Sequence, residues 1–386
     1  MTFLSRLAKL GGAKEATAGQ YLPPTFSIPF STASYEDVIA PLRDESMRAN
    51  DAVLQGISQG PQNSTFDMEV NGYPDVSGNW LRAIIGPDTV TAGVSTALSS
   101  AAAPGATSIS VAATIPAGST IMIGGTATEF AITGTPSGSG PFTIPITTPT
   151  TGLKFAHASA AAVTSQTIHT FRQNRTFNTV WPTYSWTVDD GADQLGFPGN
   201  VCSELAIKID PKGFVTMSPK WSGFPSAAQD TFAYAASAAQ PLVGWGWTVT
   251  NAGGASSRGL TMDITVKRAV EIIFSSDGTE GPREIFPGAM ETDGTYKAIY
   301  DTVTDMNLFI DAIQTPTVHT LTQPLATGGA VLAITMSQSG YTTGKRDLGQ
   351  PYVQADFALS GIANTTDAAS GGVASVSLSN YVTSSY

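Results

Sequence analysis

The stretch that decides the fold class is Leu205-Ala206-Ile207-Lys208-Ile209, followed by Asp210-Pro211-Lys212-Gly213 and then by Phe214-Val215-Thr216. Its first five residues are apolar at every second position, a pattern that predicts a strand with one buried face. Asp-Pro-Lys-Gly has the composition of a tight turn, and Phe214 and Thr216 continue the alternation beyond it. Two strands joined by a short turn predict an antiparallel hairpin.

The same alternation recurs along most of the chain. Its other apolar positions are Phe66, Met68 and Val70; Tyr184, Trp186 and Val188; and Leu260, Met262, Ile264 and Val266. Turns such as Asp189-Asp190-Gly191 and Ser276-Asp277-Gly278 lie between such strands and favour hairpins over strand-helix-strand crossovers. We therefore predict a mainly β fold, an antiparallel β-sandwich or barrel.

Helical spacing is clearest between Tyr300 and Ile313. Apolar residues recur there at intervals of three and four, which predicts one helix packed across the sheet. These residues are Val303, Met306, Phe309, Ile310 and Ile313. The segment from Ala40 to Ile57 also allows a helix, with acidic residues early and a thin apolar stripe later.

The first 30 residues are predicted to form an extended arm. Tyr21-Leu22-Pro23-Pro24 and Ile28-Pro29-Phe30 favour extended backbone, because proline restricts its own conformation and that of the preceding residue.

Residues 95–166 differ in composition from the rest of the chain. They consist largely of Ala, Ser, Thr, Gly, Pro and Ile, and their only charged residues are Glu129 and Lys154. Short alternating runs recur between Gly and Pro residues, which favours a folded segment over a disordered linker. We expect a small all-β domain here, inserted into a main β-sandwich domain formed by residues 1–94 and 167–386.

The composition indicates a surface with few charges. Only 13% of the 386 residues are charged, about half of the ~25% usual for soluble domains. The net charge is −11, and basic residues occur singly or in pairs such as Lys267-Arg268 and Lys345-Arg346. Tight nucleic-acid binding is therefore not expected. No apolar run approaches the ~20 residues that span a bilayer, so we expect neither a membrane anchor nor a secretion signal.

Residues that often carry chemistry are scattered. Cys202 is the only cysteine and lies in an alternating run, so we interpret it as a buried apolar residue. His157, His169 and His319 are far apart in the sequence, without the paired spacing of a metal site.

Other candidates also have simpler interpretations. Gly124-Gly125 and Gly371-Gly372 lack the pattern of a phosphate-binding loop. The acidic residues Asp189-Asp190, Asp263 and Glu271 are interpreted as turn and surface residues, although a glycosidase pair stays open.

Trp245 and Trp247 would place two indoles on one side of a strand, a geometry that suits sugar stacking, a subunit contact or a core. We predict no catalytic, cofactor-binding or metal-binding residues, no cofactor and no enzymatic activity.

Taken in order, the segments resemble the tail tube proteins of siphophages, particularly those of phages that infect actinobacteria. The resemblance rests on the order of several short runs. These are residues 12–19 with Tyr21-Leu22-Pro23-Pro24; the apolar element 80–86; His169-Thr170-Phe171; the strand 184–188; the hairpin 210–216; residues 263–268; Glu284-Ile285-Phe286-Pro287-Gly288; the helix from Tyr300; and the closing runs 352–357 and 376–381. The segment 95–166 departs from the plain family pattern and looks like an added decoration domain.

The resemblance implies a structural virion protein of the phage tail, made in the host cytoplasm. Members of this family self-assemble into hexameric rings whose sheets join in a continuous barrel, and the rings stack into a hollow tube through which the genome passes. It implies contacts with other copies and with the tape measure, tail terminator and baseplate hub proteins. DNA would be a weakly interacting cargo, and an acidic chain suits a lumen that repels it. The inserted domain would then lie on the outer tube surface.

Two other functions stay open at this stage. A receptor- or carbohydrate-binding virion protein can be built from similar acidic, threonine-rich β domains. A baseplate hub protein shares the tube fold but forms a single terminal ring.

Overall fold

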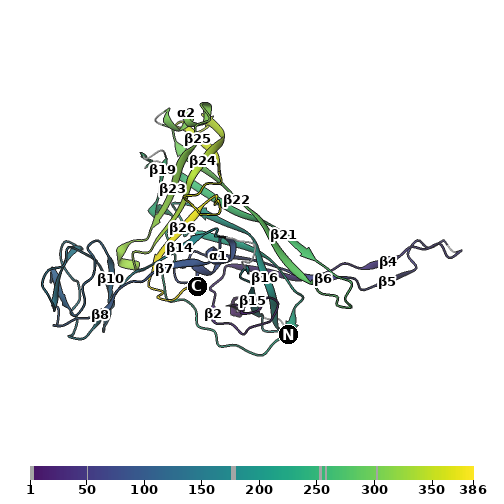
Figure 1. Cartoon of the computed structure of the whole chain (residues 1–386), viewed down its shortest axis with the longest axis horizontal. Helices are drawn as coiled ribbons and strands as arrows, with labels where there is room; N and C mark the ends of the chain where they lie inside the picture. Colours follow the sequence, from purple (N-terminus) through teal and green to yellow (C-terminus); the bar gives the residue numbers. More distant parts are fainter. Residues whose placement is uncertain (1–3, 50, 175–179, 252–253, 257–258, 301–302) are drawn as a thin grey trace.

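The structure is a computed structural model that describes residues 4–49, 51–174, 180–251, 254–256, 259–300 and 303–386 (Figure 1). Strands dominate it, and every strand pairing within these residues is antiparallel. The predicted mainly β, antiparallel fold is confirmed.

Most of the described strands join in one large, strongly curved sheet. Its strands are β1 (Lys9–Lys14), β2 (Phe26–Ser27), β3 (Thr32–Ile39), β6 (Gln62–Asn71), β7 (Asp88–Thr91), β14 (Thr167–Arg172), β15 (Tyr184–Asp189), β16 (Gln194–Ile209), β17 (Thr216–Gly223), β18 (Ala227–Ala228), β19 (Trp247–Asn251), β20 (Gly254–Ser256), β21 (Gly259–Ile273), β22 (Glu284–Ile299), β23 (Thr315–Thr322), β24 (Val331–Asp347), β25 (Gln354–Gly361) and β26 (Ser375–Asn380).

Strand β16 links two layers of this sheet. Near its start it pairs with β15, where Trp186 lies opposite Phe197, and β15 in turn pairs with β1. Beyond an irregularity between Cys202 and Glu204, β16 pairs with β17 on one side and with β21 on the other. The second layer therefore runs in the order β3, β6, β17, β16, β21 and β22.

Aromatic side chains fill the space between the layers. Trp186 from β15 and Trp221 from β17 lie with ring centroids 4.7 Å apart, and Trp80 from helix α1 (Ser77–Ile84) lies 5.4 Å from Trp186. All three are at most 1% exposed. The apolar element expected around residues 80–86 is therefore mostly helix, and it is buried in the core.

The helix predicted at 300–313 is present as α2 (Thr304–Ile310), which contacts β24. It packs through Met306 and Leu308, and Phe309 is half-buried. Val303, Ile310 and Ile313 are exposed, so the predicted apolar stripe is only partly covered by this chain.

Three local predictions were wrong. The described residues between 40 and 57 form no helix; β4 (Leu42–Asp44) and β5 (Gly56–Ser58) occur there instead and pair as a hairpin. Phe214 precedes β17 and is 48% exposed, because the second strand of its hairpin begins only at Thr216. Trp245 and Trp247 do not share a strand face, because Trp245 lies in the turn η2 (Gly244–Gly246) and Trp247 begins β19.

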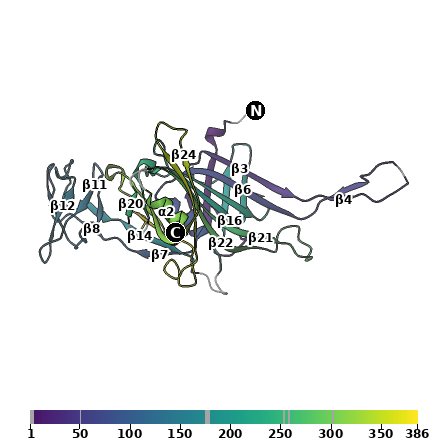
Figure 2. The ribbon, with the colours of Figure 1, turned by 90° about the horizontal axis from the view of Figure 1, so that it is seen from above.

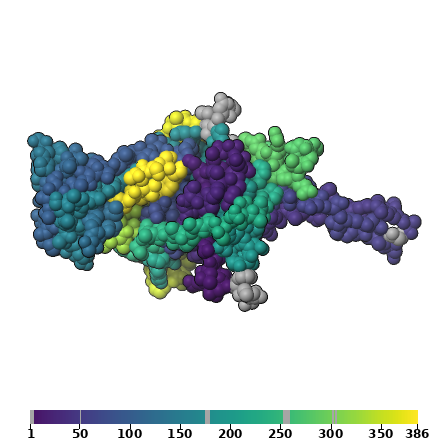
Figure 3. All heavy atoms as spheres, turned by 90° about the horizontal axis from the view of Figure 1, so that it is seen from below, coloured from purple at the N-terminus to yellow at the C-terminus, as the bar shows by residue number. Residues whose placement is uncertain are grey.

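The N-terminal segment is extended, but much of it packs on its own chain. After the short turn η1 (Ser5–Leu7), β1 lies between β2 and β15. A Cβ atom added to Gly12 would lie 2.2 Å from the Trp186 ring, so only glycine permits this close approach. In Figure 3 the N-terminal segment (purple) and the C-terminal segment (yellow) lie side by side on one face.

Residues 95–165 form a separate six-stranded sheet at one end of the molecule (Figure 1). Its strands are β8 (Ser95–Ala97), β9 (Ser108–Val111), β10 (Thr120–Ile123), β11 (Glu129–Thr133), β12 (Phe142–Thr148) and β13 (Ala162–Ser165). They enclose their own apolar cluster, which includes Ile109, Ile121 and Val163. Next to this sheet lies the turn η3 (Leu325–Thr327), where Gln166 donates to the Gly328 carbonyl at 2.9 Å.

Residues 40–49 and 51–60 project from the opposite end as a long hairpin, named here the hairpin arm (Figure 2). It continues strands β3 and β6 beyond the body of the sheet. Its base is fixed where the Gln62 N–H donates to the Glu280 carbonyl at 2.9 Å.

We expect Trp186→Ala to lower the free energy of unfolding by about 3–5 kcal/mol, because it removes a buried indole from the aromatic core. Trp245→Ala, which alters a 64% exposed indole, should change it by less than about 0.5 kcal/mol. Urea denaturation of the purified protein measures both values. Equal losses in the two variants would contradict the proposed role of the aromatic core.

Candidate functional site

The histidines lie in three different parts of the molecule and are held by local contacts. His157 is buried beside Glu129, with 3.2 Å between Nε2 and Oε2. Glu129 also accepts the N–H groups of Lys154 and Phe155. Burial favours a higher pKa for Glu129, but these hydrogen bonds outweigh it and lower the pKa. The contacts tie together the loops of the six-stranded sheet.

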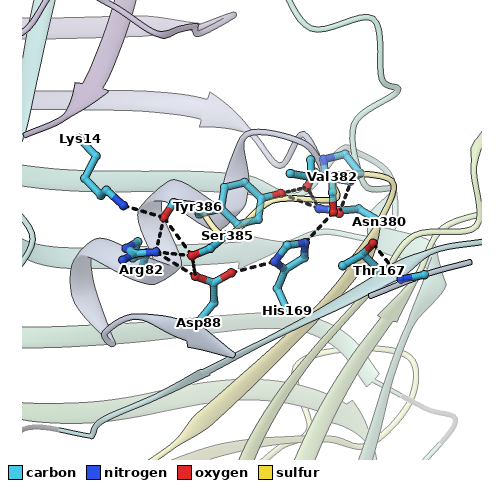
Figure 4. Close-up of polar contacts among 11 residues, drawn as sticks. Lys14, Arg82, Asp88, Thr167, His169, Asn380, Val382, Ser385 and Tyr386 are labelled. Atoms are coloured by element: carbon cyan, nitrogen blue, oxygen red, sulfur yellow. Dashed lines mark hydrogen bonds and ion pairs between the residues drawn. The ribbon is translucent and has the colours of Figure 1, made fainter. Parts of the chain in front are cut away.

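His169 belongs to a buried polar cluster that holds the C-terminal segment (Figure 4). The Asp88 side chain is fully buried, and it receives hydrogen bonds from His169 Nδ1 at 2.8 Å, Arg82 Nη1 at 2.9 Å and the Ser385 hydroxyl at 2.7 Å. Burial alone would raise the pKa of Asp88, but the hydrogen bonds from His169 and Ser385 outweigh it and hold the pKa below its ordinary value.

The order of contacts in this cluster is not that of a nucleophile activated by a base. His169 Nε2 lies 2.9 Å from the Val382 carbonyl, and the Ser385 hydroxyl donates to Asp88 instead of to the imidazole. A serine nucleophile needs its own contact with the base. The cluster therefore fastens residues 380–386 against α1, where Tyr386 packs on Gly78.

A second buried carboxylate, Glu15, holds the N-terminal segment. It accepts hydrogen bonds from the hydroxyls of Thr183 and Ser185 at 2.7 and 2.6 Å, and from the N–H groups of Gly19 and Gly199 at 2.8 and 2.7 Å. Sequence inspection missed Glu15, because a single glutamate in a Gly- and Ala-rich run has no pattern that shows it is buried.

The remaining sequence candidates are structural or lie at the surface. Cys202 is fully buried, and burial raises the pKa of its thiol, which suits an inert apolar residue. Asp189 pairs with Lys9 Nζ at 3.0 Å, and Asp190 accepts from the Tyr35 hydroxyl at 2.8 Å. Both acids also accept N–H groups of their own turn.

The glycine pairs and tryptophans likewise show no built ligand site. The Gly124 carbonyl accepts from His157, and the Gly372 N–H donates to the Asn364 carbonyl. Trp247 is 9% exposed, whereas Trp245 is 64% exposed, so the two indoles do not form a sugar platform. Within the described ranges, no group of three or more His, Cys, Asp or Glu residues is placed to hold a metal ion.

On the surface, a row of side chains with alternating charge crosses five neighbouring strands. Strand register places these residues side by side on β6, β17, β16, β21 and β22. In that order they are Asp67, Lys220, Glu204, Lys267 and Glu291. Lys220 Nζ lies 3.0 Å from Glu204 Oε1, which closes one of these pairs.

Two further groups extend the row over the same face of the sheet. Lys208 lies opposite Asp263, while Asp356 lies opposite both Lys297 and Lys345. Residues next to them along the strands, such as Ile207, Ile264 and Phe357, are buried, so the charged residues point outward. We name this surface, defined by Asp67, Lys208, Lys220, Glu204, Asp263, Lys267, Glu291, Lys297, Lys345 and Asp356, the charged face.

Exposed apolar side chains gather elsewhere, above all on the hairpin arm. On the arm they are Leu42, Met47, Val53, Leu54 and Ile57, and at the α2 tip they are Val303, Ile310, Ile313, Leu348 and Tyr352. A cavity of about 910 Å³ lies between η1, strand β3 and the β15–β16 turn, and Phe30, Tyr35 and Tyr234 contribute to its lining.

None of the helices in the described parts of the chain is long and apolar enough to cross a membrane.

The third histidine, His319, allows a test of how the core responds to pH. It is buried against Trp247, and neither ring nitrogen has a hydrogen-bond partner among the described residues. Burial lowers the pKa of His319 to about 3, whereas the unfolded value is about 6.5. The contribution of the neutral ring to the free energy of unfolding is therefore fully present above about pH 6.5. It is lost as the pH falls toward 3.

Between roughly pH 6 and 4, the free energy of unfolding of the native protein should fall by up to about 1.4 kcal/mol more per pH unit than that of His319→Phe. Urea denaturation at several pH values measures this difference, because all other titrating groups are common to both proteins. Parallel pH profiles would contradict a neutral, buried His319.

Comparison with known families gives a match over most of the chain. A family model described as phage tail tube protein matches residues 5–361. No curated protein matches the chain. The family match spans strands of both layers of the main sheet as well as the six-stranded sheet, and it confirms the resemblance to phage tail tube proteins seen in the sequence. The chain belongs to the phage tail tube protein family.

Proposed function

We propose that this chain is the structural subunit of a siphophage tail tube, assembling into stacked hexameric rings that enclose a DNA channel. The family match supports a structural component of the virion tail. The hairpin arm is the observation that carries the finer proposal. A two-stranded hairpin is marginally stable alone, and this one leaves Leu42, Val53 and Ile57 more than half exposed. Such a projection is suited to packing against another copy.

Strand β3 supports lateral joining of copies. It pairs with β6 on one side, and the strand pairings of the described residues give it no partner on the other. An open edge of this kind invites another strand, and closure of a ring removes the exposed edge. The 910 Å³ cavity beside β3 offers space for side chains of a neighbouring copy.

The α2 tip supports stacking. It lies well away from the hairpin arm in Figure 1, so the two apolar surfaces of one copy cannot cover each other. A contact between different surfaces of identical copies repeats head to tail, and it yields rings or filaments. Contacts of the terminal rings with tape measure, tail terminator and baseplate hub proteins belong to the same proposal.

We further propose that residues 95–166 are an inserted domain on the outer tube surface, within a main domain of residues 1–94 and 167–386. The entry and exit strands support this division, because β8 and β13 pair with each other and Ser95 lies opposite Thr164. Val94 and Ser165 also exchange hydrogen bonds at 2.7 and 2.8 Å. The chain therefore leaves and re-enters the main sheet at one point.

The purified protein should form hollow tubes or stacked rings in negative-stain electron microscopy, with light scattering that rises with concentration. Leu42→Ser with Ile57→Ser should abolish stacking, because it removes apolar contact area from the hairpin arm. Its melting temperature should stay within a few degrees, because both side chains are exposed.

Phe155→Ser is the matched control, since it changes an exposed apolar residue of the proposed outer domain. Normal tubes from the arm variant would contradict the role of the hairpin arm. Single rings from the native protein would favour a baseplate hub, and persistent monomers would contradict self-assembly.

Deletion of residues 95–166, with a short Gly-Ser linker between Val94 and Thr167, should leave tube formation intact and reduce the outer diameter. Gly93 and Thr167 already lie within hydrogen-bond distance, at 3.3 Å, so the linker spans a short gap. Electron microscopy measures the diameter. Loss of assembly by a folded deletion variant would show that the domain takes part in subunit contacts.

A further inference from the structure

We infer that the charged face is the surface past which duplex DNA moves, and that its carboxylates keep its lysines from gripping phosphates. This inference rests on the proposed tube function and adds to it a location and a role for individual residues. It arises from the strand register, which places Asp67 beside Lys220 and Glu204 beside Lys267, although these residues are far apart in the sequence.

The two central lysines each lie between two carboxylates. Lys220 has Asp67 on one neighbouring strand and Glu204 on the other. Lys267 has Glu204 and Glu291 in the same arrangement. A lysine flanked in this way has its charge compensated within the face.

The outer lysines of the face have carboxylate neighbours as well. Lys208 lies opposite Asp263. Lys297 Nζ lies 3.9 Å from Asp356 Oδ2, and the register places Lys345 opposite the same carboxylate. The pattern therefore extends across the sheet from β6 to β24.

Stability does not account for such an arrangement. Lys220, Lys267 and Lys297 are exposed, and ion pairs between exposed side chains contribute little to folding. The larger consequence is for the electric field outside the sheet. Neighbouring strands lie about 4.8 Å apart, which is less than the Debye length of about 8 Å at physiological salt. Opposite charges at that spacing largely cancel at distances greater than the spacing itself, so a polyanion approaching the face meets little net attraction.

The ten residues that define the charged face balance one another, five lysines against five carboxylates, and acidic residues beside them add negative charge. Glu69 lies on the same side of β6 as Asp67, and Asp293 lies on the same side of β22 as Glu291, so carboxylates outnumber lysines. Free lysines would bind phosphates by releasing counterions, and each such contact would have to break as the DNA advances. A weakly acidic surface, on which the lysine charges are compensated by carboxylates, lets DNA pass without strong contacts to its phosphates.

Removing the carboxylates on both sides of one lysine tests their role. Asp67→Asn with Glu204→Gln removes both neighbours of Lys220, and we expect at least tenfold tighter binding of a short labelled duplex at low salt. Fluorescence anisotropy measures this binding on subunits or tubes, so the result does not depend on assembly. The gained affinity should fall steeply with salt and should disappear when Lys220→Gln is added.

The matched control is Asp230→Asn with Asp311→Asn, which removes the same charge from exposed positions off the charged face. If the control binds DNA as tightly as the first variant, net charge alone explains the effect and the masking role is refuted. If Lys220→Gln does not reverse the gain, the role assigned to this lysine is refuted.

A labelling experiment tests the location. Thr295 lies on the charged face opposite Asp263 and is exposed. In assembled tubes, Thr295→Cys should react with a small maleimide but not with one attached to a polymer too large for the lumen. Phe155→Cys should react with both reagents.

Modification of Thr295→Cys by the large reagent would place the charged face outside the tube, and protection of Thr295→Cys from the small reagent would make the face a subunit contact. Either result would overturn the inference while leaving tube formation, judged by microscopy, unaffected.

Discussion

The fold depends on the buried aromatic contact between its two layers. Trp186 comes from the layer of β1 and β15, Trp221 comes from the layer of β6 and β17, and Trp80 of α1 contacts both. Strand β16 belongs to both layers and fixes their separation through its own backbone pairing. Because close-packed aromatic rings tolerate little displacement, this contact makes the body of the subunit a rigid support for the surfaces around it.

Both chain ends are fastened to this body by buried carboxylates. Glu15 gathers two hydroxyls and two backbone N–H groups around the N-terminal segment. Asp88 does the same for the C-terminal segment through Arg82, His169 and Ser385. A buried carboxylate is costly unless its oxygens are paired, so each one specifies the position of the segment that satisfies it. The residues most typical of enzyme sites, an Asp, a His and a Ser, thus serve to hold structure in this chain.

Charged side chains and exposed apolar side chains occupy different parts of the surface. Charged side chains alternate across the face of the second layer, whereas apolar side chains are exposed on the hairpin arm and at the α2 tip. A tail tube subunit needs both kinds of surface, because contacts between copies require apolar area and a DNA channel requires the absence of tight phosphate contacts. We regard this separation as the physical basis of the proposed function.

The sequence by itself determined the β class, the antiparallel hairpins and the helix near residue 304, because alternation and turn composition are local properties of the chain. It also determined the family, through the order of short segments. It misassigned residues 40–57, where a thin apolar stripe resembled a helix but the chain extends β3 and β6 into the hairpin arm. It could not show that Glu15 is buried or that Lys220 lies between Asp67 and Glu204. Only the tertiary structure decided those placements, because strand register joins Asp67 to Lys220 across more than a hundred positions and no local pattern records which distant residues become neighbours.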